Sequence, residues 1–257
     1  MLTNYHTHHN RCHHAGGTVE DYVKEAIRHN YLEIGISCHV PYKNFPEAGN
    51  LRMSYGELES YFQDIEDAQK KYPEISILKS LECEYASKVH DYLEQLKQRT
   101  DYLILGQHFI EKEGRFMDSY SFSKPEQLEV YAENIERAIK TNLYKILAHP
   151  DLFMIHYPVW DEMCIEITHR IAKVVNENDV FLEFNANGLR YDLKTYEFEK
   201  RYPYPVIEFW RIIRDYYPEI KVLVNSDCHD PSSLNDDAME KAREMARDLN
   251  LNVLEKL

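Results

Sequence analysis

The sequence lacks a long hydrophobic run, an excess of basic residues and a leader-like N-terminus. No stretch of about 18 residues is apolar throughout, so we expect no transmembrane helix and no membrane partner. No basic segment followed by an apolar one opens the chain, so we expect no secretory signal and a cytoplasmic protein. Acidic residues outnumber basic residues by 44 to 30, which gives a formal net charge of −14. Such a surface repels nucleic-acid phosphates, and we expect no nucleic-acid partner.

Paired cysteine spacings are also absent. The chain has five cysteines and no C-x-x-C motif. An odd number without paired spacing argues against a disulfide framework, and free cysteine packs as a small hydrophobic residue. We therefore expect free thiols at the five positions, which are Cys12, Cys38, Cys83, Cys164 and Cys228.

The hydrophobic pattern alternates between short strand-like runs and longer helical ones. The first 14 residues indicate a strand that runs into a group of histidines, and further strands are expected at 32–38, 75–81, 101–107, 143–148, 180–184 and 220–225. Helices are expected from residue 18 and at 54–72, 87–99, 125–141, 160–176, 205–217 and 235–250, with a long loop at 109–123. This alternation predicts a parallel sheet with covering helices. No linker interrupts it, so we expect one α/β domain over residues 1–257.

Histidines and carboxylates recur where the predicted strands end. His6 and His8 are two residues apart, so on an extended strand both point to the same side. The nine candidates of this kind are His6, His8, His14, His39, Glu82, His108, His149, Asp227 and His229. Imidazole and carboxylate are ligands for Zn, Fe and Mn. Nine ligands are too many for one ion, whereas two or three ions that share a bridging carboxylate would use them all.

The distribution of these candidates also bears on the fold. A TIM-type barrel places its active site at the C-terminal ends of its strands, all round the rim. An open doubly wound sheet places its site at one switch point instead. Candidates at the ends of most strands therefore favour a seven-stranded barrel.

Other residues compete with these candidates. A lone histidine is more often a surface or core residue than a ligand. Four histidines lie within or beside predicted helices and are given no role in the site: His29, His90, His156 and His169. His9 alternates away from the side of His6 and His8. Glu84 would share the face of Glu82, so the residues alone leave the choice between these two carboxylates open.

Seven short motifs carry the candidates: His6-Thr-His8, Cys12-His13-His14-Ala15, Ser37-Cys-His39-Val-Pro41, Leu81-Glu82-Cys-Glu84-Tyr85, Gly106-Gln-His108-Phe109, Ala148-His149-Pro150-Asp151 and Ser226-Asp227-Cys-His229. Together they resemble the PHP (polymerase and histidinol phosphatase) superfamily over essentially the whole chain. The most similar branch is the histidinol phosphatases, on the C-x-H-A at 12–15, the H-F-I at 108–110 and the N-x-x-G-L-R at 185–190. Two neighbours of the candidates depart from the family pattern. Cys38 stands where an acidic residue often precedes the motif histidine, and 79–81 replaces a glycine-containing run.

The resemblance implies a distorted (β/α)7 TIM-like barrel with three divalent metal ions, which would be Zn, Fe or Mn. It selects Glu82 over Glu84. By motif position, the first ion would be held by His6, His8, Glu82 and Asp227, the second by Glu82, His108 and His149, and the third by His14, His39 and His229.

The resemblance also implies hydrolysis of a small phosphate monoester, with L-histidinol phosphate in histidine biosynthesis as the expected substrate. A metal-activated hydroxide would attack the phosphorus. The expected catalytic residues are Asp227, His229 and Arg190. The guanidinium of Arg190 would contact the phosphate, although a surface salt bridge is the plain alternative. Either Asp227 or a metal-bound water would protonate the leaving alcohol.

Other functions fit parts of the pattern. The nearest alternative is a PHP phosphoesterase of other specificity, such as a broad phosphomonoesterase or a phosphotyrosine phosphatase, because substrate choice lies in loops. An editing nuclease is disfavoured by the acidic charge. An amidohydrolase would usually place a lysine at the fourth strand end, where this chain has His108. A non-catalytic metal protein would close the coordination sphere of its ions.

Overall fold

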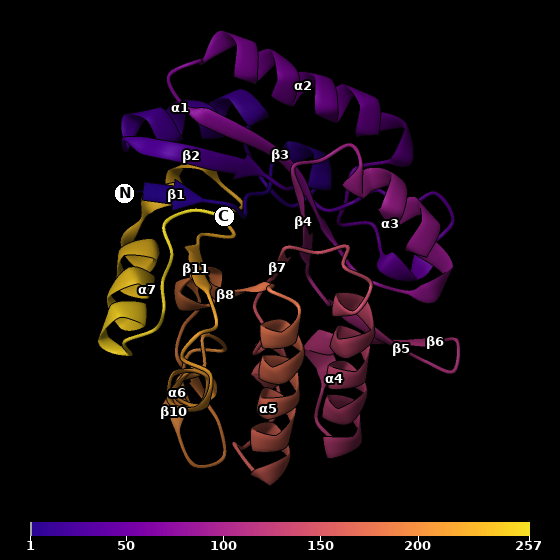
Figure 1. Cartoon of the computed structure of the whole chain (residues 1–257), viewed down its shortest axis with the longest axis vertical. Coiled ribbons are helices and arrows are strands. Elements are labelled where there is room, and N and C mark those ends of the chain that lie inside the picture. Colours follow the sequence, from indigo (N-terminus) through magenta and orange to yellow (C-terminus); the bar gives the residue numbers. More distant parts are fainter. Residues whose placement is uncertain (1) are drawn as a thin grey trace.

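Seven parallel strands form the central sheet of the computed structural model, which describes residues 2–257 (Figure 1). Met1, the first residue of the predicted N-terminal strand, lies outside the described residues. The strands follow one another in chain order across the sheet, and every neighbouring pair is parallel. They are β1 (Leu2–Asn4), β2 (Tyr31–Ile36), β3 (Ser76–Cys83), β4 (Tyr102–Leu105), β7 (Ile146–Leu147), β8 (Phe181–Asn185) and β11 (Val222–Asn225).

The sheet curls until its first and last strands meet just beyond their C-terminal ends. Thr7 and Cys228 form a parallel bridge there. The backbone N–H of Asp227 donates to the carbonyl of His6 at 3.0 Å, and that of His8 donates to the carbonyl of Cys228 at 3.0 Å. The predicted seven-stranded, TIM-like barrel is therefore confirmed as a nearly closed barrel, and its seam lies where the candidate residues are.

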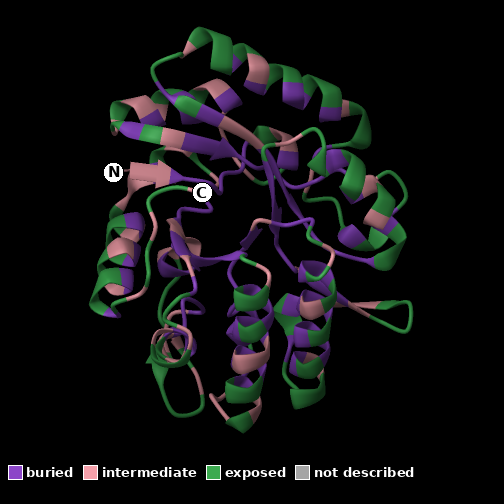
Figure 2. Ribbon diagram, in the orientation of Figure 1, coloured by how far each residue is buried: buried purple, intermediate pink, exposed green. Residues whose placement is uncertain are grey.

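Within residues 2–257, seven α-helices surround the barrel, and Figure 1 shows their arrangement around it. They are α1 (Val19–Arg28), α2 (Leu58–Lys71), α3 (His90–Lys97), α4 (Pro125–Ile139), α5 (Glu162–Glu177), α6 (Ile207–Tyr216) and α7 (Asp237–Asp248). In Figure 2, burial is densest along the barrel strands, and each helix alternates between buried and exposed residues. This amphipathic pattern holds the helices against the sheet.

The helix starts follow from local sequence. Thr18 and Asp21 form a reciprocal capping box at α1, with Thr18 N donating to Asp21 at 2.8 Å and Asp21 N donating to the Thr18 hydroxyl at 3.3 Å. Pro125 is the first residue of α4, where a missing N–H leaves no unpaired donor. Asp236 caps α7 by accepting from Met239 N at 3.0 Å. Such caps set where each connection leaves the barrel rim.

Two connections differ from the sequence prediction. The predicted loop at 109–123 contains an antiparallel hairpin of β5 (Phe109–Lys112) and β6 (Arg115–Asp118), which projects from the barrel in Figure 1. Its turn consists of Glu113 and Gly114, both with positive φ, at 52° and 74°. A second hairpin, β9 (Lys194–Thr195) with β10 (Lys200–Arg201), was also not predicted. Both have mixed polar sequences without the apolar alternation that marks a strand.

Neither a disulfide nor a helix able to cross a membrane is found within residues 2–257. All five cysteines are free and buried, as expected. Within residues 2–257, none of the helices combines the length and the apolar character needed to cross a bilayer.

Candidate metal centre

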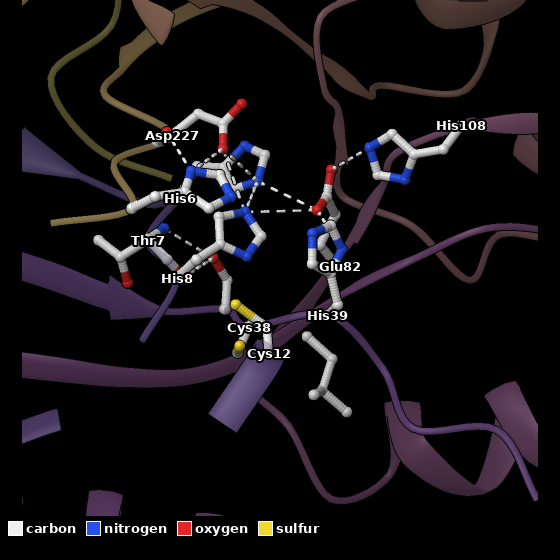
Figure 3. Close-up of polar contacts among 12 residues, drawn as sticks. His6, Thr7, His8, Cys12, Cys38, His39, Glu82, His108 and Asp227 are labelled. Atoms are coloured by element: carbon white, nitrogen blue, oxygen red, sulfur yellow. Dashed lines mark hydrogen bonds and ion pairs between the residues drawn. The ribbon is translucent and has the colours of Figure 1, made fainter. Parts of the chain in front are cut away.

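The nine predicted side chains meet at the C-terminal ends of the barrel strands. Those from widely separated segments lie together in Figure 3, which labels His6, His8, His39, Glu82, His108 and Asp227. Seven of the nine line one cavity of about 700 Å³. The other two, His6 and His149, lie below it and are 0% and 2% exposed. The structure thus brings all nine residues to one place.

The first predicted group has short separations. The Nε2 atoms of His6 and His8 lie 3.0 Å apart. Asp227 Oδ1 lies 3.1 Å from His8 Nε2 and 3.6 Å from His6 Nε2. Glu82 Oε2 lies 3.4 Å from both ring nitrogens. Two imidazoles and two carboxylates therefore surround one small volume.

The second group lies on the other oxygen of Glu82. Glu82 Oε1 is 3.2 Å from His108 Nε2 and 3.2 Å from His149 Nε2. The two ring nitrogens are 3.3 Å from each other. Because the two carboxylate oxygens of Glu82 face different groups, this residue is placed to bridge two ions.

The third group lies nearer the opening of the cavity. The Nε2 atoms of His14 and His229 are 3.0 Å apart. The ring of His39 stacks on that of His14, with centroids 5.3 Å apart, and its Nδ1 lies 2.9 Å from Glu82 Oε2. His39 therefore joins the third group to the bridging carboxylate.

Hydrogen bonds at the far side of four rings define which nitrogen faces the cluster. In each ring Nδ1 lies next to an oxygen: Glu183 Oε1 at 2.9 Å for His6, Glu84 Oε1 at 2.9 Å for His108, the Cys12 carbonyl at 2.8 Å for His14 and the Asp227 carbonyl at 3.2 Å for His229. In the neutral form of each ring, which is the form that binds a metal ion, Nδ1 donates to the oxygen and Nε2 therefore carries a lone pair. Those lone pairs point at one another and at carboxylates, which is unfavourable unless a cation lies among them. This is the usual arrangement of histidine ligands and their outer partners.

Buried polar atoms without a hydrogen-bond partner also indicate that a cation belongs in the cluster. His39 Nδ1 and Glu82 Oε2 are buried and make no well-aligned hydrogen bond in the described chain, and neither does His149 Nδ1. A buried polar atom without a partner is destabilising. The donor set of imidazole nitrogens and carboxylates suits Zn, Fe or Mn, and the residues present fit such ions.

The cluster carboxylates are charged despite their burial. Burial would raise the pKa of Glu82, but the neighbouring His108, His6 and His39 outweigh it and hold that pKa well below its usual range. Burial also acts to raise the pKa of Asp227, and His6 and His8 lower it overall. Both groups are therefore anionic.

Glu183 is a supporting residue that the sequence analysis missed. It lies inside the barrel on β8 and is 0% exposed. Its Oε1 accepts from His6 Nδ1 at 2.9 Å and from Asn225 Nδ2 at 3.0 Å. Its Oε2 accepts from the His149 backbone N at 3.1 Å and from Asn185 Nδ2 at 2.7 Å. A glutamate within the otherwise apolar run 180–184 was the available signal, because an unpaired buried carboxylate is rare.

Glu84 has a related role. It is buried at 1% exposure, pairs with Arg52 at 2.9 Å and orients His108 through Nδ1. Burial acts to raise the pKa of Glu84, but Arg52 and His108 lower it to about 2. The structure thus places Glu82 in the cluster and Glu84 behind it.

Backbone geometry positions three of the site residues. His149 and Asp227, each just after a strand, have positive φ of 30° and 47°. Strained backbone of this kind concentrates at functional sites. A Cβ on Gly106, the residue just after β4, would lie 2.1 Å from Glu82 Oε1. Glycine at this position therefore leaves room for the carboxylate of Glu82.

Arg190 does not line the cavity wall with the cluster. Its Nε donates to Asp236 at 2.8 Å, and its terminal nitrogens donate to the carbonyl and hydroxyl of Ser226 and to the carbonyl of Ser233. These bonds tie the segment after β8 to that after β11. The predicted contact of Arg190 with a phosphate stays a prediction.

Both the sequence and the fold of this chain resemble those of known proteins. The model of the PHP domain family matches residues 4–187. A candidate histidinol phosphatase, HisK from Listeria monocytogenes, has a TM-score of 0.75 at 22% identity, covering 92% of this chain and 98% of that one. Histidinol phosphate phosphatase from Lactococcus lactis, solved with Zn, L-histidinol and phosphate, has a TM-score of 0.71 at 18% identity, covering 98% and 95%.

A search of curated proteins finds no match. The structural likenesses, at such identities, establish a shared fold. The family match covers more than half of the chain and includes seven of the nine candidate residues, from His6 to His149. The chain belongs to the PHP domain family.

Proposed function

We propose that this protein is a metal-dependent phosphomonoesterase that hydrolyses L-histidinol phosphate to L-histidinol and phosphate, as a step of histidine biosynthesis. The observation that carries the proposal is the convergence of histidine lone pairs and buried carboxylates beside an open cavity. A purely structural metal site would be closed on all sides. The Lactococcus lactis protein, which has the same fold and was solved with L-histidinol and phosphate, supports this choice of substrate.

Three divalent ions, Zn, Fe or Mn, would be held by the groups described above. When bound, such ions supply positive charge to phosphate oxygens and acidify water at neutral pH. The proposed sets are His6, His8, Glu82 and Asp227 for the first ion, Glu82, His108 and His149 for the second, and His14, His39 and His229 for the third.

The chain's own residues keep these donors in position. Asn185 Nδ2 donates to Asp227 Oδ2 at 3.0 Å, which leaves Oδ1 facing the cluster. Glu183 and Glu84 fix the rings of His6 and His108. A site whose dipoles and charges are already oriented needs little reorganisation during reaction. We propose that Asp227 and His229 lie against the reacting phosphate. The leaving alcohol takes its proton either from Asp227 or from a water at the site.

The remainder of the cavity bears on specificity. It is lined by aromatic and acidic side chains, including Phe116, Tyr120, Tyr191, Glu47 and Asp118. Acidic groups favour a substrate that carries a cationic amine, as L-histidinol phosphate does. The aromatic lining would equally accept the phenyl ring of phosphotyrosine. The second candidate function is therefore a PHP phosphoesterase of other specificity.

Phosphate release from a panel of esters tests the proposal. The panel contains L-histidinol phosphate, phosphotyrosine and p-nitrophenyl phosphate, and is assayed with protein of known metal content. We expect a strong preference in kcat/KM for L-histidinol phosphate. A Glu82→Gln variant purified in the same way controls for contaminating phosphatases and should be inactive. Comparable rates across the panel would support the second candidate, and no turnover of any ester would reject both.

A further inference from the structure

We propose that His8, Cys12 and Cys38 form an additional site for one thiophilic metal ion, on the side of His8 that faces away from the cluster. One ligand atom from each residue lies within 4.8 Å of the other two. Figure 3 shows the two sulfur atoms next to one another, below the ring of His8 in that view. The proposal does not depend on phosphatase activity.

One ring nitrogen of His8 is free to bind an ion outside the cluster. Its Nε2 is occupied by the cluster, at 3.1 Å from Asp227 Oδ1 and 3.4 Å from Glu82 Oε2. Its Nδ1 is buried and has no hydrogen-bond partner among residues 2–257, in a side chain that is 1% exposed. Four other cluster rings direct Nδ1 to an oxygen. The ring of His8 instead has a nitrogen within 4.8 Å of the sulfurs of Cys12 and Cys38.

The thiols of Cys12 and Cys38 are buried and make only weak hydrogen bonds. Cys12 and Cys38 are both 0% exposed. Both sulfurs approach the same acceptor, the carbonyl of His9, at 3.1 Å from Cys12 and 3.9 Å from Cys38. A thiol is a weak donor, so one carbonyl serving two buried thiols gives little stabilisation. Two sulfurs and an imidazole nitrogen are a common ligand combination for zinc.

The chemistry of binding follows from the ligands. Each thiol releases a proton as its sulfur binds the ion. His8 also releases its ring proton if Nε2 already faces an ion of the cluster, so that the ring joins the two sites. Soft thiolate ligands select Zn or Cu(I) over Mg or Mn.

The position of the site indicates its structural effect. Cys12 ends the short 3-10 helix η1 (Asn10–Cys12), two residues before His14. Cys38 directly precedes His39. An ion held by both sulfurs would therefore clamp together the two segments that carry His14 and His39 to the cluster.

Titration of metal-free protein with Co²⁺ and Cd²⁺ tests the proposal. The nine cluster ligands include no sulfur, so a thiolate-to-metal charge-transfer band in the ultraviolet reports only a thiol site. We expect this band in the wild type, and bound Cd²⁺ that exceeds that of Cys12→Ser and Cys38→Ser by one ion per chain. Cys164→Ser, which removes another buried thiol on α5, is the matched control and should retain both the band and the ion.

Three outcomes of this titration would overturn the proposal. No thiolate band in the saturated wild type, or an equal band in Cys12→Ser and Cys38→Ser, would overturn the proposal. If the serine variants fail to fold, Cys12→Ala and Cys38→Ala are substituted, because cysteine here packs as a small apolar residue. A Cys12–Cys38 disulfide detected by mass in place of bound metal would also overturn it.

Discussion

Replacing Glu183 by glutamine tests how far the barrel interior supports the cluster. Each oxygen of Glu183 accepts two hydrogen bonds, one pair from His6 and Asn225 and the other from His149 N and Asn185. Glutamine has the same shape but replaces one oxygen with an NH₂ group. Two buried donors then face a donor, whichever way the amide turns.

The magnitude follows from that count. A buried donor left without an acceptor costs about 1–3 kcal/mol, so Glu183→Gln should lower the free energy of unfolding by about 2–6 kcal/mol. Loss of an outer partner of a histidine ligand typically weakens metal binding by about 10- to 100-fold. We expect both effects because Glu183 contacts the ring of His6 and the backbone of His149.

Urea unfolding and competition with a chelator measure the two quantities. Glu177→Gln at the exposed end of α5 is the matched control, and should change unfolding by no more than about 0.5 kcal/mol. Unfolding is measured with and without metal, so that the contribution of the hydrogen-bond network to stability is separated from that of the bound ions. Wild-type stability together with wild-type metal affinity in Glu183→Gln would refute the reasoning.

Three further perturbations test other parts of the site. Arg190→Ala should lower the free energy of unfolding by about 3 kcal/mol, because it leaves the partly buried Asp236 unpaired. The KM should stay unchanged. A raised KM at wild-type stability would instead favour the contact of Arg190 with the phosphate. Glu84→Gln should reduce kcat by about 10- to 100-fold, because the acceptor of His108 loses its negative charge and Arg52 loses its ion pair. Steady-state kinetics at matched metal content measure this, and an unchanged kcat would contradict it. Gly106→Ala should release metal, because the new methyl group overlaps the carboxylate of Glu82; metal analysis equal to wild type would show that Glu82 can move without loss.

The sequence predicted the barrel and the candidate residues of the cluster, and the family resemblance was needed to choose Glu82 over Glu84. His6 and His8 lie two residues apart at the end of the first predicted strand, and most of the later candidates follow an apolar run. Apolar periodicity and strand-end position are local signals, and the parallel barrel brings such ends together. The prediction needed no knowledge of side-chain conformation.

Other features depend on contacts that local patterns do not reveal. Glu183 appeared as one polar residue in a strand, because its four donors come from the segments after β1 and β7 and from β8 and β11. The β5–β6 hairpin was predicted as a loop, since its apolar residues do not alternate with polar ones and its turn depends on positive φ at Glu113. Arg190 matched a motif, but its observed partners come from segments more than 30 residues away.

The number of metal ions bound per chain tests the central claim most directly. Elemental mass spectrometry on purified wild type and on Glu82→Gln gives this number. The shared carboxylate predicts more than one divalent ion in the wild type, up to three in the cluster, and the loss of more than one in Glu82→Gln. At most one ion in the wild type, or an unchanged content in Glu82→Gln, would contradict the account.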